Sequence, residues 1–412
     1  MAGDSTRILI YSHDSFGLGH LRRCRAIASS LVRTRRDLSV LIVSGSPLIG
    51  SFEFPARVDF VRVPGVTKLS NGEYSSLTLH LAFDEVLALR ESIIRHTAEA
   101  FRPDMLIVDK EPLGLRGEMS ATLDLLRDRG TYLVLGLRDV LDEPARLADE
   151  WARKNAVPTL RDYYDRIWVY GLGAICNPLA GIPLPPGVSE RMVYTGYLRR
   201  EMPARGYSET AAEAVAAAGE PYVLVTSGGG GDGEALFDQV LAAYEHDPDL
   251  PLAAVLLLGP FMPATVRDAL RARAAAIERV SGVLTFDPRV EALMEGAAGI
   301  VAMGGYNTFC EILSFDKPAI LVPRLEPRME QFIRASRAQE LGLVRMFNPG
   351  LPEPARRMAE ALRSLPDQSR PSDAYMPGLL DGLENIDALV GEGLASGPAR
   401  SRGRPVPAVR AV

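Results

Sequence analysis

Cysteine and histidine are scarce in this sequence, which has three cysteines and five histidines among 412 residues. Cys24, Cys176 and Cys310 lie far apart, which is typical of reduced thiols and not of a disulfide framework. No group of His and Cys has the spacing of a zinc site, and no Asp-x-Asp pair falls in a suitable loop. The sequence therefore predicts a cytoplasmic protein that needs neither a metal ion nor another cofactor.

Long apolar runs and an excess of positive charge are also missing. No stretch of about 18 or more apolar residues occurs, so we expect no transmembrane helix. The net charge of −6 argues against general binding to nucleic acid. Residues 1–7 carry no secretory pattern and lead directly into an apolar run. These features favour a cytoplasmic enzyme or a small-molecule-binding protein.

Apolar, β-branched runs alternate with helical patterns along the chain. This alternation indicates βαβ units, and the length of 412 residues suggests two domains. We expect an α/β fold with two doubly wound, Rossmann-like domains and a ligand cleft between the carboxyl ends of their strands. The predicted limits are 1–200 for the first domain, 201–395 for the second and 396–412 for a disordered tail.

The same patterns predict the individual elements. The segment 177–188 is rich in Pro and Gly and is expected to be irregular. Helices are predicted at 20–35, 84–101, 118–129 and 290–295. Strands are predicted at 7–11, 38–44, 58–63, 105–109, 131–137 and 166–170, and then at 222–226, 253–258, 283–286, 299–302 and 319–322.

The segment 301–311 contains the most informative pattern. An apolar strand leads into Gly304 and Gly305, and a helix then carries Glu311 about two turns further on. Glycines let backbone N–H groups approach a ligand, and a helix N-terminus favours negative charge. We expect this crevice to suit a diphosphate that carries a ribose, with Glu311 accepting hydrogen bonds from sugar hydroxyls. A second apolar strand then leads to Glu330 and Gln331.

A glycine-rich loop, 227–233, follows the first predicted strand of the second domain and opens a helix. In that position, the backbone N–H groups of Ser227, Gly228, Gly229 and Gly230 would form a cradle for a phosphate. The alternative is a flexible turn without a ligand. The Gly-Lys-Ser/Thr ending of a Walker loop is absent, and the Gly-x-Gly-x-x-Gly dinucleotide pattern is not met.

Gly17, Gly19 and His20 mark the predicted helix start after the first strand. A histidine there points into the cleft, and the helix dipole lowers its pKa, so a neutral imidazole could act as a general base toward an acceptor hydroxyl. The alternative is a solvent-exposed capping histidine. His13 is a weaker candidate on the same rim.

Charged residues near the same strand ends are candidates for the acceptor side. Arg22, Arg23 and Arg25 would either bind an anionic acceptor or form a solvated helix face, the second being favoured for Arg23 and Arg25. Asp109 and Arg138 each fall at the carboxyl end of a predicted strand. Asp109 would assist His20, hold an acceptor hydroxyl, or cap the following helix.

The segments 17–20 and 304–331 resemble the GT-B glycosyltransferases, in particular the glycosyltransferase 28 group that contains the peptidoglycan N-acetylglucosaminyltransferase. The resemblance implies a UDP-sugar donor, an inverting and metal-independent transfer, and an acceptor linked to a lipid or polysaccharide at the inner face of the membrane. It implies that Glu311 binds the ribose and that the Gly pair lies near the diphosphate. It also implies that Glu330 and Gln331 hold the donor sugar and that Phe286 packs on the base, the alternative for Phe286 being a buried residue at a strand end. Asn307 would contact the donor because it lies beside the expected diphosphate, or would be an ordinary residue near the helix N-cap.

Three alternatives remain open on the same scaffold. The stretch 19–24 also resembles the start of the sugar-nucleotide hydrolases of nonulosonic acid synthesis. An epimerase of nucleotide sugars would use the same fold. A binding or regulatory protein without turnover would keep the nucleotide site and would not need His20 for binding.

Overall fold

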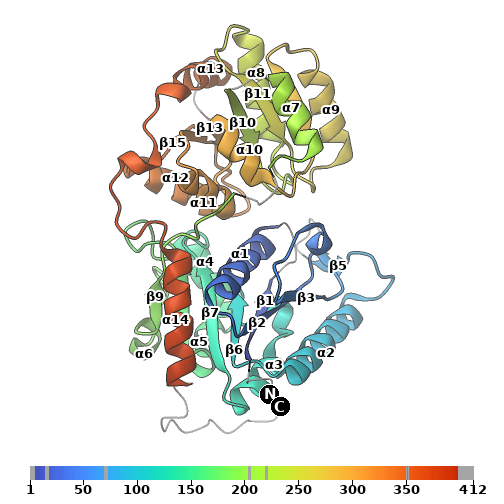
Figure 1. Ribbon diagram of the computed structural model, residues 1–412, viewed down its shortest axis with the longest axis vertical. Helices are drawn as coiled ribbons and strands as arrows, with labels where there is room; N and C mark the ends of the chain where they lie inside the picture. The colour runs from blue at the N-terminus through green and yellow to red at the C-terminus, as the bar shows by residue number, and fades with distance from the viewer. Residues whose placement is uncertain are drawn as a thin grey trace.

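The computed structural model describes residues 5–13, 18–68, 73–202, 206–218, 221–348, 350 and 352–397. Two α/β domains are stacked along the long axis of the molecule (Figure 1). Each is built on its own parallel sheet with helices on both faces, so the predicted class of two doubly wound domains is confirmed. Gly17 and nearly all of the predicted tail 396–412 lie outside the described residues.

The first domain is built on a seven-stranded parallel sheet with the order β3-β2-β1-β6-β7-β8-β9. Its central strands are runs of buried apolar residues because helices cover both faces. The strands are β1 (Thr6–Ser12), β2 (Leu38–Ser44), β3 (Val58–Arg62), β6 (Met105–Asp109), β7 (Tyr132–Arg138), β8 (Arg166–Tyr170) and β9 (Met192–Tyr194). The helices are α1 (Gly19–Thr34), α2 (Phe83–Phe101), α3 (Ser120–Asp128), α4 (Pro144–Arg153), α5 (Ala156–Tyr163) and α6 (Pro186–Ser189).

The second domain contains a six-stranded parallel sheet with the order β12-β11-β10-β13-β14-β15. The strands are β10 (Tyr222–Thr226), β11 (Ala253–Leu257), β12 (Val280–Leu284), β13 (Ala297–Ala302), β14 (Ala319–Leu321) and β15 (Arg345–Met346). The helices are α7 (Glu209–Ala218), α8 (Glu234–His246), α9 (Ala264–Ala274), α10 (Val290–Gly296), α11 (Tyr306–Ser314), α12 (Glu330–Glu340) and α13 (Pro354–Ser364).

The sequence patterns missed or misplaced the shortest elements. In place of the predicted strand 283–286, β12 begins three residues earlier and ends two residues earlier, because pairing with β11 sets its position. The edge strands β9 and β15 have only three and two residues. An antiparallel pair, β4 (Val66–Lys68) with β5 (Tyr74–Ser76), was not predicted either. The short helix α6 begins inside the stretch 177–188 that we expected to be irregular.

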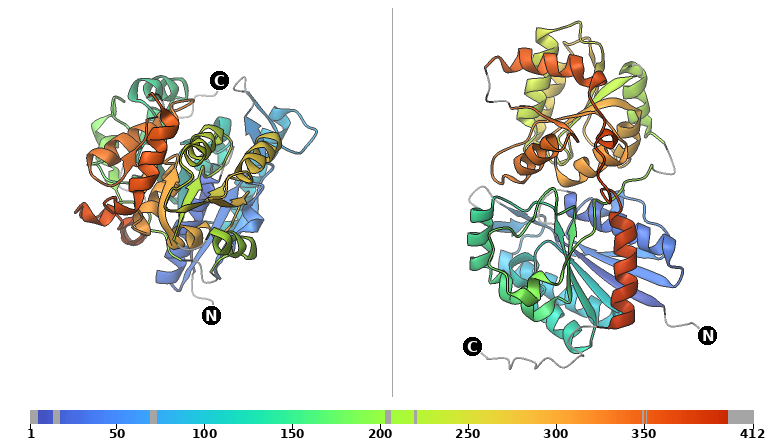
Figure 2. Two further views of the ribbon diagram at one scale, coloured as in Figure 1. Left: turned by 90° about the horizontal axis from the view of Figure 1, so that it is seen from above. Right: turned by 90° about the vertical axis from the view of Figure 1, so that its left-hand side faces the viewer.

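The last helix corrects the predicted domain limits. Helix α14 (Gly382–Ser396) was assigned to the second domain, but it packs beside α1 of the first (Figures 1 and 2). Arg35 donates from Nε to Asp387 at 2.8 Å, and the Thr34 hydroxyl donates to the same carboxylate at 2.7 Å. A Cβ on Gly393 would lie 2.9 Å from the Tyr132 ring, so its lack of a side chain permits the close approach. The first domain is therefore discontinuous in sequence.

The chain crosses between the domains twice, and the two crossings lie side by side. Tyr197 donates its backbone N–H to Leu379 at 2.8 Å, and Gly382 donates to the Tyr197 carbonyl at 3.2 Å. Gly196 has a φ of +88°, and a Cβ there would lie 2.5 Å from the Gly378 carbonyl oxygen. A hinge of two paired segments constrains how the domains sit over each other.

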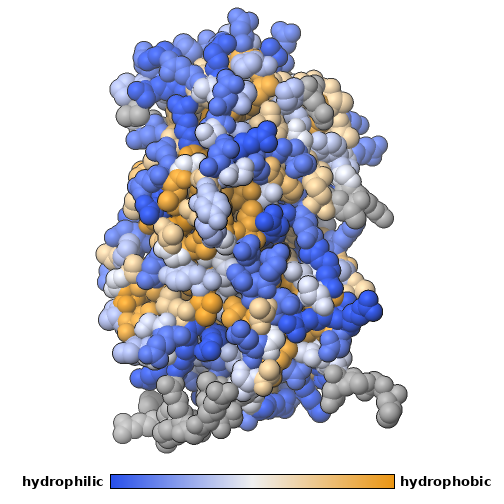
Figure 3. Space-filling model, turned by 60° about the vertical axis from the view of Figure 1, so that its left-hand side comes forward, coloured by the Kyte–Doolittle hydropathy of each residue, from blue (hydrophilic) through white to orange (hydrophobic). Residues whose placement is uncertain are grey.

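On the side of the molecule that carries α14, hydrophobic residues gather in the middle third, at the level where the domains meet (Figure 3). The upper end of this face, formed by the second domain, is largely hydrophilic. Within the residues that the structure describes, none of the helices combines the length and hydrophobicity needed to cross a membrane.

Candidate functional site

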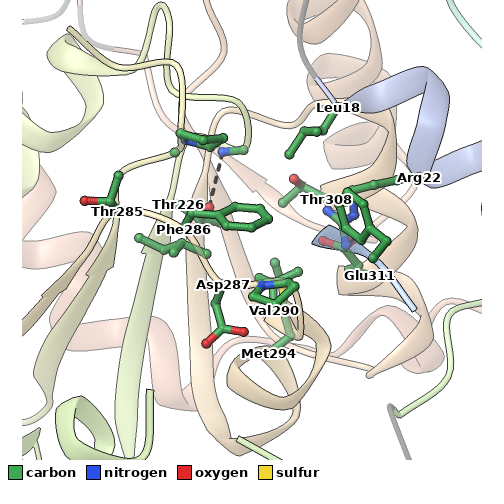
Figure 4. A pocket seen from close by; sticks show the side chains of 16 residues that line it. Leu18, Arg22, Thr226, Thr285, Phe286, Asp287, Val290, Met294, Thr308 and Glu311 are labelled. Atoms are coloured by element: carbon green, nitrogen blue, oxygen red, sulfur yellow. Dashed lines mark hydrogen bonds and ion pairs between the residues drawn. The ribbon is translucent and has the colours of Figure 1, made fainter. Parts of the chain in front are cut away.

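A pocket lies between the two domains at the carboxyl ends of the strands of both sheets (Figure 4). It contains four of the side chains or glycines that the sequence singled out, namely Arg22, Gly228, Phe286 and Glu311. Its other lining residues are Leu18, Phe52, Thr226, Leu257, Gly259, Pro260, Thr285, Asp287, Pro288, Val290, Met294 and Thr308. The first domain contributes Leu18, the N-cap residue of α1, Arg22 of α1, and Phe52 from the segment after β2.

Glu311 lies on the second turn of α11 and is 1% exposed. Its carboxylate forms an ion pair with Arg22 of α1, which lies beside it in Figure 4. Arg22 also donates to Glu291 of α10 at 2.9 Å. Burial raises the pKa of Glu311 to about 7; Arg22 opposes this shift and Glu291 adds to it. One carboxylate oxygen, Oε2, is buried and has no hydrogen-bond partner among the described residues.

Helix α11 presents its N-terminus at the same pocket. Gly305 is its N-cap and contributes no side chain, and Thr308 of the first turn lines the pocket. Gly304 before it has a φ of +82°, a conformation that favours glycine. The first backbone N–H groups of a helix have no intrahelical partner and attract negative charge. The predicted diphosphate position is therefore adjacent to Glu311.

The glycine-rich loop after β10 forms the opposite wall. Gly228 and Gly230 have φ values of +75° and +91°. A Cβ on Gly230 would lie 2.5 Å from the Leu258 carbonyl oxygen, so this close turn requires glycine. The Ser227 hydroxyl donates to the same carbonyl at 2.6 Å, and the phosphate contact predicted for the backbone N–H of this residue stays a prediction. Only Gly228 of the four predicted loop residues lines the pocket; Gly229 is a neighbour in the turn.

An aromatic pair, Phe52 and Phe286, lines the pocket. Phe286 and Phe52 meet edge to face with ring centroids 6.2 Å apart. They belong to an apolar cluster with Leu18 and Leu21 of the first domain. Phe286 lies in the middle of the pocket view in Figure 4. Its position agrees with the predicted packing on a nucleotide base, although that contact stays a prediction.

His20 lies on the first turn of α1, and its Nδ1 contacts a carboxylate oxygen of Asp109 at the end of β6. Arg23 donates to both oxygens of that carboxylate, at 2.8 and 2.6 Å. Burial lowers the pKa of His20 to about 4, although Asp109 acts in the opposite direction. Burial opposes ionisation of Asp109, but Arg23 and His20 hold its pKa well below the usual range. With Nδ1 assigned as the donor to Asp109, a neutral His20 offers Nε2 as a base.

The other predicted acceptor residues surround this group. His13 is buried, lies edge-on to His20 at 5.6 Å between ring centroids, and has its pKa lowered by burial to about 3. Gly19 is exposed at the start of α1. Burial lowers the pKa of Arg138 to about 10, and its Nε has no hydrogen-bond partner in the described part of the chain.

Besides three residues of the glycine-rich loop and the pair Gly304 and Gly305, the predicted donor residues Asn307, Glu330 and Gln331 do not line the pocket. Asn307 joins the domains instead: it donates to the Gly19 carbonyl at 2.9 Å and accepts from Arg200 at 2.7 Å. Glu330 and Gln331 start α12 and are nearly buried. Arg324 donates to Glu330 Oε1 at 2.7 Å, while Oε2 has no partner among the residues described. Glu330 thus has one carboxylate oxygen without a partner in the described part of the chain, whereas the amide of Asn307 is already engaged.

Sequence reasoning missed two buried ion pairs at this site. Arg23 is 1% exposed, so the expected solvated face is wrong for this residue. Asp139, after β7, accepts from Arg334 of α12 at 2.7 and 2.6 Å, and both residues are fully buried. Arg334 also donates to the Gly304 carbonyl at 2.9 Å. The placement of Asp139 at a strand end was a signal for a site residue, but nothing marked its partner 195 positions away.

Comparisons with known proteins bear on this geometry. No model of a known protein family matches the chain. An uncharacterized glycosyltransferase of Methanosarcina acetivorans is 22% identical over 397 residues, which covers 91% of this chain and 95% of that protein. One from Methanosarcina mazei is 24% identical over 354 residues, covering 82% and 84%.

Solved structures of glycosyltransferases share the arrangement of both domains. A UGT transferase from Siraitia grosvenorii, in complex with UDP, has a TM-score of 0.60 at 15% identity and covers 94% of this chain and 99% of its own. MurG of Acinetobacter baumannii has a TM-score of 0.55 at 14% identity, and the match covers 94% of this chain and 99% of MurG. The glycosyltransferase VinC, in complex with dTDP, has a TM-score of 0.58 at 17% identity, and the match covers 97% of this chain and 100% of VinC. The fold is GT-B. In this GT-B chain, the pocket of Glu311 lies between the two domains and the His20–Asp109 pair belongs to the first.

Proposed function

We propose that this protein is a glycosyltransferase that moves a hexose-type sugar from a UDP-sugar to an acceptor hydroxyl. One observation carries the proposal: a buried carboxylate, Glu311, lies within one pocket beside the N-terminus of α11, a glycine turn and the ring of Phe286. A ribose, a diphosphate and a base need these three kinds of partner. UDP and dTDP appear in the complexes of similar structures, and both are pyrimidine nucleoside diphosphates.

The roles of the first-domain residues follow from the His20–Asp109 contact. Nε2 of His20 takes the proton of the acceptor hydroxyl while Asp109 orients the ring and stabilises the imidazolium. The acceptor oxygen forms a bond to the anomeric carbon, and the bond from that carbon to the diphosphate breaks with inversion. The amides at the start of α11 stabilise the charge that develops on the leaving diphosphate.

The donor sugar would lie toward α12, where Glu330 has a free carboxylate oxygen and Gln331 is its neighbour. In this arrangement the sugar is placed between Glu330 and the side of the cleft that carries His20. Closure of the domains would exclude water, so that the acceptor and not water attacks the anomeric carbon.

The acceptor is proposed to be linked to a lipid or a polysaccharide of the cell envelope. Four leucines of the first domain support a peripheral contact with the inner face of the membrane, because each is 41% to 43% exposed: Leu77, Leu79, Leu81 and Leu89. They follow β5 or lie on α2.

Thermal-shift measurements against UDP-, GDP-, dTDP- and CMP-sugars test the donor assignment. We expect a UDP compound to raise the melting temperature of the wild-type protein and Glu311→Ala to abolish the shift. Stabilisation by none of the nucleotides would overturn the proposal. Incubating the best donor without an acceptor separates transfer from hydrolysis, since rapid release of free sugar would favour the hydrolase.

A further inference from the structure

A second hollow, of about 170 Å³, lies behind the nucleotide pocket at the junction of the domains. One wall is α1 and the other is the segment 199–202, where the chain first crosses between the domains; α10 and α14 complete it. It is lined by Arg22, Arg25, Ala26, Ser29, Arg33, Arg199, Arg200, Glu201, Met202, Glu291 and Leu383. We call it the hinge groove. It shares only Arg22 with the nucleotide pocket.

The hinge groove has an excess of positive charge. Five arginines line it, from one face of α1 and from the facing segment, and two glutamates accompany them. Glu291 pairs with Arg22 at 2.9 Å and Glu201 pairs with Arg33. Within the described part of the chain, Arg25, Arg199 and Arg200 form no ion pair with a carboxylate. Three of the five guanidinium groups thus lack a direct ion pair, although Glu291 and Glu53 act on Arg25, and Glu311 on Arg200, from a longer distance.

Arg200 is the buried member of this group, with 7% of its surface exposed. Its Nη2 donates to Asn307 at 2.7 Å, but its buried Nε has no hydrogen-bond partner among the described residues. A buried guanidinium donor without a partner is unfavourable, so this group is suited to receive an anion. Burial also lowers the pKa of Arg25; Glu291 opposes this shift, while Arg22 and Arg200 add to it.

We infer that the hinge groove is a binding site for a phosphate-class anion, held by Arg25, Arg199 and Arg200 and separate from the nucleotide pocket. Planar guanidinium forks match phosphate oxygens, and three unpaired cations suit a multiply charged anion better than a single carboxylate. The source is either a soluble phosphate, such as a phosphate ester or pyrophosphate, or the headgroup of an anionic phospholipid. The inference does not depend on the transfer reaction.

Occupation of the groove would act on the junction between the domains. Arg200 holds Asn307, and Asn307 donates to the Gly19 carbonyl at the start of α1, one residue before His20. Arg25 comes from the first domain and Arg199 and Arg200 from the crossing segment. An anion that bridges them ties α1 to the hinge and fixes the position of the first domain under the donor pocket.

Calorimetric titration with inorganic pyrophosphate at constant ionic strength tests the site. The double variant Arg25→Ala/Arg199→Ala is expected to bind at least about tenfold more weakly than the wild type, since it removes two of the three cationic partners of the anion. The matched control, Arg95→Ala/Arg153→Ala, removes two exposed arginines outside the groove and should bind as the wild type does. Glu311→Gln should weaken UDP binding and leave pyrophosphate binding in the hinge groove unchanged.

Two further arms identify the source of the phosphate. Flotation with vesicles of phosphatidylcholine, alone or mixed with phosphatidylglycerol, is compared for the wild type and the two double variants. A headgroup is indicated if the wild type and the control bind the mixed vesicles and Arg25→Ala/Arg199→Ala does not. A soluble ligand is indicated if the wild type binds pyrophosphate but does not bind the mixed vesicles. Equal binding of pyrophosphate and vesicles by both double variants overturns the inference, even where UDP binding and transfer are intact.

Discussion

Arg22 of α1 forms an ion pair with Glu311 of α11, so the carboxylate that we assign to the ribose is paired with a cation from the other domain. Arg22 has a second carboxylate within reach, because it donates to Glu291 at 2.9 Å. The guanidinium can therefore release Glu311 to a ligand and keep one ion pair. Arg22 thus takes part both in the contact between the domains and in controlling access to the nucleotide site.

The raised pKa of Glu311 predicts how donor binding depends on pH. A ribose hydroxyl donates to the ionised carboxylate, and burial places the pKa of Glu311 at about 7. The affinity for a UDP-sugar, whose diphosphate does not titrate in this range, should rise about fivefold to tenfold from pH 6 to pH 8. Glu291→Gln should move the midpoint to lower pH, because Glu291 raises the pKa of Glu311. Titration calorimetry across this pH range measures the affinity. If Glu311→Gln showed the same pH dependence of donor affinity as the wild type, Glu311 would not be the titrating ribose ligand.

His20→Ala should abolish transfer and leave donor binding intact. Loss of a general base lowers kcat by about 10²- to 10⁴-fold. Because burial holds the pKa of His20 at about 4, the imidazole is neutral throughout the neutral range. The kcat of the wild type with saturating substrates should therefore show no acid limb near pH 6.5. Unchanged turnover in the variant would exclude His20 as the base.

The buried pair of Asp139 and Arg334 should stabilise the contact between the domains. Removing one member leaves an uncompensated buried charge, so Arg334→Met should cost about 3–5 kcal/mol of unfolding free energy. Asp139→Asn combined with Arg334→Met should cost less than the sum of the single changes. Urea unfolding followed by circular dichroism measures this coupling. Strict additivity would show that the two residues act independently.

Helix α14 should unfold together with the first domain. Asp387→Ala removes its partly exposed contacts with Arg35 and Thr34 and should cost about 0.5–1 kcal/mol. Both tryptophans of the chain, Trp151 and Trp168, are buried in the first domain, so their fluorescence reports its unfolding. The control Glu392→Ala changes an exposed residue of the same helix. A loss of stability that the tryptophans do not report would place α14 outside the first domain.

The fold was predictable from the sequence because parallel strands between helices are buried on both faces. The predicted strands 38–44, 105–109, 166–170 and 222–226 match β2, β6, β8 and β10 at both ends. The strands β9 and β15 are too short for such a pattern. The position of α14 depends on contacts with residues more than 250 positions earlier, such as Gly393 against Tyr132, and no local pattern records these.

The site residues that lie in a short, recognisable sequence pattern could be predicted. Gly228, Phe286 and Glu311 each follow a strand or glycine turn, and they meet in one pocket. The ion pairs of the site were not predictable. Arg22 was a candidate for an anionic acceptor and not for a pair with Glu311, and Arg23 and Arg334 have the sequence appearance of ordinary surface arginines. Only the closeness of the two domains buries them against Glu311, Asp109 and Asp139.

Calorimetric titration of UDP into the wild-type protein and Glu311→Gln tests the central claim most directly. A lost hydrogen bond to a carboxylate is worth about 1.5–3 kcal/mol, so the variant should bind UDP about 10- to 100-fold more weakly. Glu295→Gln, an exposed change on α10, should bind as the wild type does. Equal affinity of the wild type and Glu311→Gln, or no UDP binding by either, would contradict the assignment of this pocket to a nucleotide.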